Sequence, residues 1–222
     1  MCKKPLHRNG FFIAKYTELC YNRFIKKQRG GDTVNKTCCF TGYRPHRFAF
    51  SQDGLRPEQV QEALGVQIRR LYDEGVRTFI SGMSAGVDLW AAAEVLSLQR
   101  LYPDVRLVAA IPFTGQESRW PIPVQREYRR ILDACQQVEV LCTSVEASED
   151  PSACYRHRNR WMVDRAGTVL AVCEVDVADS RTGTASTVRY ARRQQRRILY
   201  IHPQTLALTE ETVQQIQFDF DE

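Results

Sequence analysis

Short apolar runs alternate along the chain with longer stretches in which apolar residues recur every three or four positions. The first pattern is typical of buried strands and the second of amphipathic helices. We expect six strands, at residues 37–41, 76–80, 105–113, 138–142, 168–173 and 197–201. We expect five helices between them, at residues 57–74, 87–102, 124–134, 153–166 and 183–195. The alternation favours an α/β fold, in which helices cover both faces of a mostly parallel sheet.

Three parts of the chain lie outside this alternation. Residues 143–152 are polar and acidic, which predicts a loop. A basic segment precedes the first strand, and the residues after Pro203 show only a weak pattern. We therefore expect an N-terminal extension at residues 1–36, one folded domain at residues 37–203 and a C-terminal tail at residues 204–222.

Glycines, hydroxyl groups and arginines gather where the predicted strands end. In parallel α/β folds, ligands bind outside the carboxyl ends of the strands. The segments at those ends are residues 41–44, 81–88, 113–120 and 181–187. Their composition predicts a site for an anionic ligand, built from several loops.

The second of these segments joins a strand to a helix through a turn with two glycines, Gly82 and Gly86. Such a turn can aim backbone N–H groups and the Ser84 hydroxyl at a phosphate. Asp88 could then accept a hydrogen bond from a ribose or a base. The alternatives are an ordinary turn that needs glycine for tight geometry, and a carboxylate that only complements the helix dipole.

Two further glycine segments could hold phosphate. At the end of the first strand, Gly42 lets a ligand approach the backbone and Arg44 can bind phosphate with two hydrogen bonds. The alternative is a turn with a surface arginine. Gly183 and Thr184 open the last predicted helix, whose N-terminus could also hold phosphate.

The helix predicted at residues 153–166 has an unusual polar face. Arg158 and Trp161 are three residues apart, so they could stack on a nucleotide and neutralise it, whereas Tyr155 suits the core. A simple ion pair between Arg160 and Asp164 is the alternative for the neighbouring face.

Composition excludes several classes of protein. The eight cysteines form no Cys-x-x-Cys pair and no zinc-ligand spacing with histidine, so we expect reduced thiols, no metal and a cytoplasmic protein. No apolar run approaches the roughly 20 residues that span a membrane, and the N-terminus lacks a signal-peptide pattern. Three of the histidines, His46, His157 and His202, lie in no sequence context for a Ser-His-Asp triad.

Basic residues divide the chain unevenly. Residues 1–36 hold nine Lys or Arg against two Asp or Glu, and the rest of the chain holds 22 against 24. All six lysines lie in that first segment. We hypothesise that residues 1–33 are upstream sequence and that translation starts at Val34; the alternative is a basic tail that contacts nucleic acid or an anionic membrane. N-terminal sequencing of the native protein distinguishes the two. The slightly acidic body predicts no nucleic-acid partner.

The motifs of residues 36–203 resemble the YpsA-like family of the SLOG superfamily. That superfamily also contains the LOG cytokinin-activating phosphoribohydrolases and the DprA DNA-processing proteins. The resemblance rests on CCFTGYRP at residues 38–45, the turn and helix at 79–94, AAIPF at 109–113, RNRWMVD at 158–164 and GTASTV at 183–188. It implies a Rossmann-like three-layer sandwich and a pocket for a nucleotide-derived ligand, and it implies no particular reaction.

Two comparisons within the superfamily bear on chemistry. The Glu-Arg-Lys-x-x-Met helix of LOG enzymes resembles residues 157–162, which places their catalytic-type arginine at Arg158. Their Pro-Gly-Gly-x-Gly-Thr-x-x-Glu motif is matched only in part, because Thr187 stands where the glutamate is expected. The Ser-Gly-x-Ala-x-Gly-Ile-Asp turn of DprA, a single-stranded DNA-binding protein, resembles Ser81–Asp88.

From these residues we expect a protein that binds or senses a nucleotide, a nucleotide-sugar or an ADP-ribose-like molecule. The alternatives are a phosphoribohydrolase-like N-glycosidase and DprA-like binding of single-stranded DNA. Candidate catalytic residues are Arg158, Asp88 and Glu117, with Asp164 as a further carboxylate. Candidate ligand-binding residues are Gly42, Arg44, Gly82, Ser84, Gly86, Asp88, Trp90, Arg158, Asn159, Trp161, Gly183, Thr184 and Thr187. The sequence names no cofactor, predicts no membrane partner and leaves a homo-oligomer open.

Overall fold

The computed structural model describes residues 31–51, 54–176 and 182–212. The chain divides into a unit at Met1–Val34 and a unit at Asn35–Glu222. In the first unit only residues 31–34 are described, within helix α2 (Gly31–Asn35). The hypothesis about residues 1–33 therefore falls almost entirely outside the described residues, and every element below belongs to the second unit.

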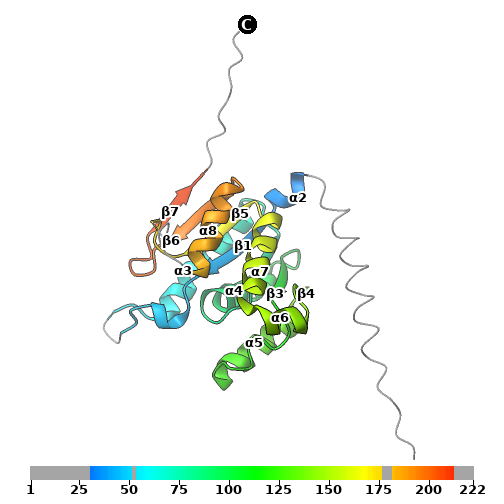
Figure 1. Cartoon of the computed structure of the whole chain (residues 1–222). Helices are drawn as coiled ribbons and strands as arrows, with labels where there is room; N and C mark the ends of the chain where they lie inside the picture. The colour runs from blue at the N-terminus through cyan, green and yellow to red at the C-terminus, as the bar shows by residue number, and fades with distance from the viewer. Residues whose placement is uncertain (1–30, 52–53, 177–181, 213–222) are drawn as a thin grey trace, which may run out of the picture. The chain divides into compact units, whose positions relative to one another are not determined.

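A seven-stranded sheet forms the centre of the second unit (Figure 1). Its strands are β1 (Thr37–Gly42), β2 (Thr78–Ser81), β3 (Arg106–Ile111), β4 (Gln137–Val140), β5 (Thr168–Val172), β6 (Arg197–Ile201) and β7 (Leu208–Glu211). Their order is β4-β3-β2-β1-β5-β6-β7, and all neighbours are parallel except β6 and β7. The predicted α/β class with a mostly parallel sheet is confirmed.

Helices cover the two faces of the sheet in separate layers. The helices are α3 (Pro57–Asp73), α4 (Val87–Leu101), α5 (Ile122–Ala134), α6 (Ser144–Glu149), α7 (Pro151–Arg165) and α8 (Gly183–Arg193). In one layer α4 packs on β1, β2 and β3 and also contacts α3 and α5. In the other layer α7 packs on β1, β3 and α8, while α8 packs on β1, β5 and β6. The five predicted helices are all present, with bounds that differ by a few residues.

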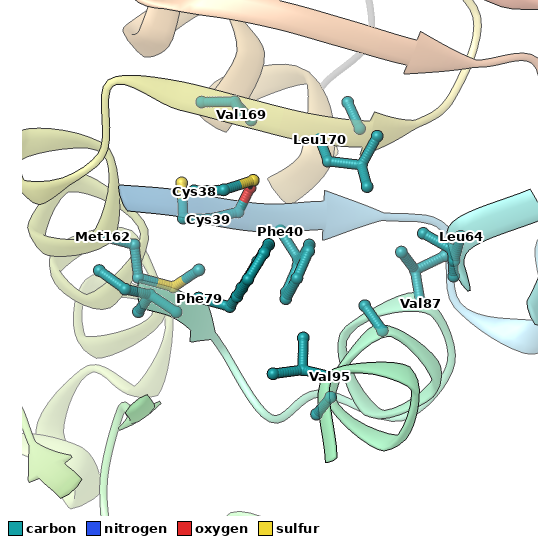
Figure 2. Close-up of a cluster of buried hydrophobic side chains, with 14 of the residues drawn as sticks. Cys38, Cys39, Phe40, Leu64, Phe79, Val87, Val95, Met162, Val169 and Leu170 are labelled. Carbon is teal, nitrogen blue, oxygen red and sulfur yellow. Dashed lines mark hydrogen bonds between the residues drawn. The ribbon is translucent and has the colours of Figure 1, made fainter. Parts of the chain in front are cut away.

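The core lies where the central strands meet α4 and α7 (Figure 2). The rings of Phe40 and Phe79, from adjacent strands, stack with centroids 6.0 Å apart, next to Val95 of α4. Cys38 and Cys39 on β1 are fully buried, as expected for thiols that pack as small hydrophobic groups. Strands covered on both faces need apolar residues at successive positions, which is why these strands appear as continuous apolar runs.

The loop predicted at residues 143–152 is wrong, because the segment contains helix α6 and the start of α7. Thr143 and Glu146 form a capping box: the Thr143 side chain accepts from the Glu146 N–H, and the Glu146 carboxylate accepts from the Thr143 N–H. No residue of α6 is buried, so the helix has no apolar face to detect. The Thr-x-x-Glu signature was present in the sequence and was overlooked.

The region after Pro203 also contains an element that the sequence did not predict. Strand β7 pairs antiparallel with β6, so part of the expected tail extends the sheet. Three of its four residues are exposed and the fourth is half-buried, which leaves no alternating pattern. Three ion pairs hold the strand instead, between Arg197 and Glu210 at 2.7 Å, between Arg70 and Glu210 at 3.1 Å, and between Arg192 and Glu211 at 2.9 Å.

The order of the strands creates a switch point beside β1. The chain proceeds from β1 through β2 and β3 to β4 on one side, then crosses back to place β5 on the other side of β1. Connections therefore leave β1 and β5 in opposite directions. A crevice outside the carboxyl ends of two such strands is where doubly wound sheets bind ligands.

Candidate functional site

A cavity of about 340 Å³ lies at this switch point. Its size is at the low end of the range of about 300–1,000 Å³ that is usual for small-molecule sites. Its walls come from the end of β1 and the following turn, the N-terminus of α4, one face of α7 and the N-terminus of α8. The lining residues are Phe40, Thr41, Gly42, Tyr43, Arg44, His46, Arg47, Ser84, Asp88, Tyr155, Arg158, Asn159, Thr182, Gly183 and Thr184.

A buried ion pair joins α7 to the first turn of α4, and further hydrogen bonds join α7 to the turn before α4. Nη1 of Arg158 lies 3.3 Å from Oδ2 of Asp88 and also donates a hydrogen bond to the Gly82 carbonyl. Nη2 of Arg158 donates to the Ser84 hydroxyl at 3.1 Å, and the Ser84 N–H donates to Oδ2 of Asp88 at 3.3 Å. The two charged side chains are 5% and 10% exposed. The turn is therefore organised around one guanidinium group.

Burial dominates the protonation of this pair. It raises the pKa of Asp88, although the positive charges of Arg158 and Arg44 act in the opposite direction. It lowers the pKa of Arg158, although the attraction of Asp88 opposes the shift. In both groups the loss of hydration outweighs the attraction between the charges, as is common for buried ion pairs. A carboxyl group with a raised pKa at a cavity wall can take part in binding or in proton transfer.

Gly82 makes room for the Arg158 guanidinium. A Cβ atom at this position would overlap the guanidinium group and lie 2.7 Å from Oδ2 of Asp88. Gly86 has a different role: its φ of +95° favours glycine, and a Cβ atom there would lie 2.8 Å from the Tyr43 carbonyl oxygen. Neither glycine lines the cavity. Both therefore shape the site without facing a ligand.

The N-terminus of α8 closes the side of the cavity beside β1. The Thr182 side chain caps the helix by accepting from the Ala185 N–H at 3.2 Å, and the Thr184 hydroxyl donates to the Gly42 carbonyl at 2.8 Å. N–H groups in the first turn of a helix have no acceptor within the helix. Those of Gly183 and Thr184 are consequently placed at the cavity wall, where they can meet an anion.

Three polar side chains that follow β1 line the cavity: the arginines Arg44 and Arg47, and His46. The Arg47 guanidinium lies 4.6 Å from the centroid of the Tyr43 ring, and the Tyr43 hydroxyl donates to the Glu174 carboxylate. Burial, and then the contact with Glu174, raise the pKa of Tyr43 to about 12, so the hydroxyl keeps its proton. None of the ion pairs among the described residues involves Arg44 or Arg47.

The structure brings eight of the residues predicted for ligand binding to the cavity wall. They are Gly42, Arg44, Ser84, Asp88, Arg158, Asn159, Gly183 and Thr184. They come from four segments that are distant in sequence. Three of these are the predicted segments at residues 41–44, 81–88 and 181–187, whereas the fourth is on α7, and no residue of the predicted segment 113–120 lines the cavity. Asp88 and Arg158, two of the three candidate catalytic residues, are among them.

Five further predicted residues do not line the cavity, besides Gly86. Gly82 lies behind the Arg158 guanidinium, and Thr187 donates from its hydroxyl to the Gly183 carbonyl at 2.8 Å. The Trp90 ring packs against Phe48 with centroids 5.7 Å apart. Trp161 is only 6% exposed and belongs to the core, because Arg158 and Trp161 leave α7 toward different surroundings. Glu117 lies 3.9 Å from Arg129, in the loop after β3.

Tyr155 is the clearest lining residue that the sequence interpretation assigned elsewhere. It was expected in the core, but it is half-buried and lines the cavity. A spacing signal existed, because Tyr155 precedes Arg158 by three residues and Asn159 by four, which places all three on one face of a helix. The alternative ion pair in this helix is not formed in the structure: Asp164 accepts from the Tyr190 hydroxyl at 2.8 Å, and Arg160 lies over the Tyr190 ring.

Within the described residues, no group of three or more His, Cys, Asp or Glu side chains could hold a metal ion. The cysteines at positions 38, 39, 135, 142, 154 and 173 are free thiols. None of the described helices combines the length and the apolar character needed to cross a membrane.

The fold and the cavity define a doubly wound α/β protein with a polar cavity at its switch point. Residues 38–206 match the family model YpsA, described as the YspA SLOG family, and the chain belongs to that family. Among similar proteins, a UPF0398 protein of Halalkalibacterium halodurans is 30% identical over 64% of this chain and 74% of its own length. The UPF0398 protein YpsA of Bacillus subtilis is 24% identical over 72% of this chain and 87% of its own length.

One solved structure with a similar arrangement is DNA processing protein A from Helicobacter pylori, described for its single-stranded DNA binding mode. It covers 76% of this chain and 66% of its own, with 16% identity and a TM-score of 0.48. A similarity of this size carries no argument about what the present chain binds.

Proposed function

We propose that the cavity binds a nucleotide-derived ligand (a nucleotide, a nucleotide-sugar or an ADP-ribose-like molecule) and that the protein acts as a binding or sensor protein for it. The observation that carries this proposal is that two kinds of anion-binding group line one cavity. The N-terminus of α8 supplies backbone N–H groups, and Arg44 and Arg47 supply charge. Helix N-termini and arginines are the groups with which proteins hold phosphate.

The charge of the lining supports an anionic ligand. Three arginines and one aspartate line the cavity, and Asp88 is already paired with Arg158. This leaves Arg44 and Arg47 as cations without a carboxylate partner among the described ion pairs. Two cations of this kind at a cavity attract anions and repel cationic ligands.

Two other polar groups of the lining suit a sugar. Asp88 can accept hydrogen bonds from hydroxyl groups, and the Asn159 amide can both donate and accept. The same cavity therefore offers groups for phosphate and groups for sugar hydroxyls. Family membership supports this interpretation as well, because SLOG domains generally bind nucleotide-derived ligands.

A thermal-shift panel with AMP, NAD and ADP-ribose tests the proposal. A ligand that binds only the folded state raises the melting temperature in proportion to the logarithm of its concentration. We expect at least one of the three to stabilise the protein, and Arg44→Ala to remove most of that shift. Arg69→Ala is the matched control, because Arg69 has the same charge and pairs with Asp73 outside the cavity. A folded protein that none of the three stabilises contradicts the proposal.

Hydrolysis of an N-glycosidic bond is the second candidate function. One observation favours it: of the three carboxylates considered as substitutes for the missing glutamate, only Asp88 lines the cavity, and its pKa is raised. Glu117 and Asp164 contact Arg129 and Tyr190 instead. A carboxyl group beside a bound ribose could activate the attacking water or stabilise the positive charge that develops on the sugar.

Release of free base from nucleoside 5′-monophosphates tests this second candidate. We expect activity, if it is the function, to be lost in Asp88→Asn and Arg158→Ala while Arg69→Ala keeps it. Melting temperatures of the variants separate loss of chemistry from loss of folding. Stable binding of a nucleotide with no base released leaves the binding function and rejects the enzyme.

A further inference from the structure

Tyr155 is the most accessible Phe or Tyr side chain at the cavity, whose lining also includes the exposed imidazole of His46. Of the three Phe and Tyr side chains in the lining, two have little ring surface to offer: Phe40 is 1% exposed and Tyr43 is 7% exposed. The Tyr43 hydroxyl is also held by Glu174. Tyr155 is half-buried, so part of its side chain remains open at the wall.

Neighbouring groups restrict the orientation of the Tyr155 ring. The Phe113 ring, which follows β3, meets it edge to face with centroids 5.6 Å apart and planes at 73°. On α7, the Arg158 guanidinium carbon lies 5.7 Å from the centroid of the Tyr155 ring. An aromatic ring that is held by an edge contact and a cation loses little freedom when a further ring stacks on it. The wall therefore contains a preorganised flat surface.

The Tyr155 ring lies on the same wall of the cavity as residues that reach the anion-binding groups at the start of α8. Tyr155 shares one face of α7 with Arg158 and Asn159, and Asn159 reaches the start of α8: its Nδ2 lies 3.9 Å from where a Cβ atom of Gly183 would be. A ligand that contacts the first turn of α8 with a phosphate can thus extend along α7 toward Tyr155. A core tyrosine would instead pack its ring among apolar side chains and would not line a polar cavity.

We propose that Tyr155 determines specificity by stacking on a planar ring of the ligand, so that the site takes a nucleotide with its base and discriminates against the bare sugar phosphate. This inference rests on the proposed nucleotide-binding function. Stacking of a base on an aromatic side chain has a typical strength that corresponds to roughly 5- to 150-fold in affinity. Tyr155 acts as a positioning and specificity residue, without a part in any reaction.

Calorimetric titration of two probes, AMP and ribose 5-phosphate, tests the inference, because the probes share the sugar phosphate and differ by the base. The natural protein is expected to bind AMP more tightly. In Tyr155→Leu, AMP affinity is expected to fall roughly 5- to 150-fold and ribose 5-phosphate affinity to change less than about twofold. Tyr155→Phe keeps the ring and is expected to keep the preference for AMP. If Tyr155→Leu does not fold, Tyr155→Met provides the same comparison with a more adaptable side chain.

The outcomes separate this inference from the proposal beneath it. Binding of AMP and ribose 5-phosphate with equal affinity, or an equal loss for both in Tyr155→Leu, overturns the role of Tyr155 and leaves nucleotide binding intact. Loss of the preference in Tyr155→Phe also overturns it, because the ring is still present. Binding of neither probe, when AMP, NAD and ADP-ribose also fail to raise the melting temperature, overturns both.

Discussion

Two clusters in this protein pair arginines with carboxylates, and the ionisation of the carboxylates is favoured in one cluster and disfavoured in the other. At the cavity, Arg158 and Asp88 form a pair whose side chains are 5% and 10% exposed. At the edge of the sheet, Arg197 contacts Glu74 at 2.5 Å and Glu210 at 2.7 Å, and Arg70 contacts the same two glutamates, with side chains 26% to 40% exposed. The edge cluster links α3, β6 and β7, and its charges balance one another.

The contrast lies in which effect of burial dominates. At the edge, hydrogen bonds from arginine lower the pKa of Glu74 and Glu210, so ionisation is favoured there. At the cavity, burial raises the pKa of Asp88, so ionisation is disfavoured even beside an arginine. The charges of the edge cluster therefore neutralise one another. The cavity instead contains a buried pair whose ionisation is disfavoured, next to two further cations, Arg44 and Arg47. Titratable groups with shifted pKa values are more frequent at functional sites than elsewhere in a protein.

Removal of one partner from each cluster should show the largest difference. Asp88→Ala leaves a buried guanidinium that cannot lose its proton, so we expect the free energy of unfolding to fall by about 3–5 kcal/mol. Glu210→Ala, the matched change at the exposed cluster, should cost about 1 kcal/mol or less. Urea denaturation of both variants measures the difference. Equal effects of the two substitutions would show that burial of the pair has no energetic consequence.

A methyl group added at two glycines of the site should separate folding from binding. Gly82→Ala overlaps the Arg158 guanidinium, and overpacking of this kind costs about 1–3 kcal/mol in the free energy of unfolding. Gly183→Ala meets only Nδ2 of Asn159, at 3.9 Å, so the expected change in stability is less than about 1 kcal/mol in either direction.

The two variants should rank in the opposite order when loss of ligand binding, rather than loss of stability, is compared. The methyl group of Gly183→Ala lies where a phosphate would approach the first turn of α8, so the stabilisation by an added nucleotide should fall while the unliganded melting temperature stays near that of the natural protein. A Gly183→Ala variant that binds nucleotide normally, or a Gly82→Ala variant that is as stable as the natural protein, would contradict these assignments.

Acid should weaken the attachment of β7 to the edge of the sheet, because it protonates the glutamates that hold this strand. The pKa values of Glu74 and Glu210 are lowered in the folded state by hydrogen bonds from Arg197, and that of Glu211 is lowered because contacts with Arg192 and Tyr200 outweigh the effect of burial. Glutamates with lowered pKa values stabilise the fold above their unfolded pKa of 4.5, and this contribution is lost as the pH falls through the folded values.

Hydrogen exchange measured at pH 6 and at pH 3.5, and corrected for the intrinsic rate at each pH, checks this expectation. Protection of the β7 amides should decrease at the lower pH, while protection of β1 stays close to its value at pH 6. Equal loss of protection in both strands would indicate global unfolding instead. Unchanged protection of β7 would show that the glutamates do not hold the strand.

The sequence predicted most of the fold because the central strands and their helices carry strong apolar patterns. It missed α6 and β7, whose residues are exposed, so that capping by Thr143 and ion pairs from Arg192 and Arg197 hold them instead of an apolar face. The capping signature of α6 is local and could be detected from the sequence. The ion pairs that hold β7 join distant segments, so they leave no pattern in the sequence.

The same limit applies to the cavity. Glycines and arginines at strand ends could be located from sequence, because the carboxyl ends of parallel strands meet. The direction of individual side chains on α7 could not, since Trp161 and Tyr155 are both plausible for a core or for a ligand, and the structure places the first in the core and the second at the cavity. Glu117 and Thr187 show in the same way that closeness in a motif does not ensure closeness to the site.

A crystal structure determined after soaking with AMP or ADP-ribose tests the central claim most directly. The account predicts ligand density inside the cavity, with a phosphate at the N–H groups of Gly183 and Thr184 and near Arg44, and with the base against the Tyr155 ring. Density for the nucleotide at another surface, with the cavity at the ends of β1 and β5 unchanged, would contradict the account.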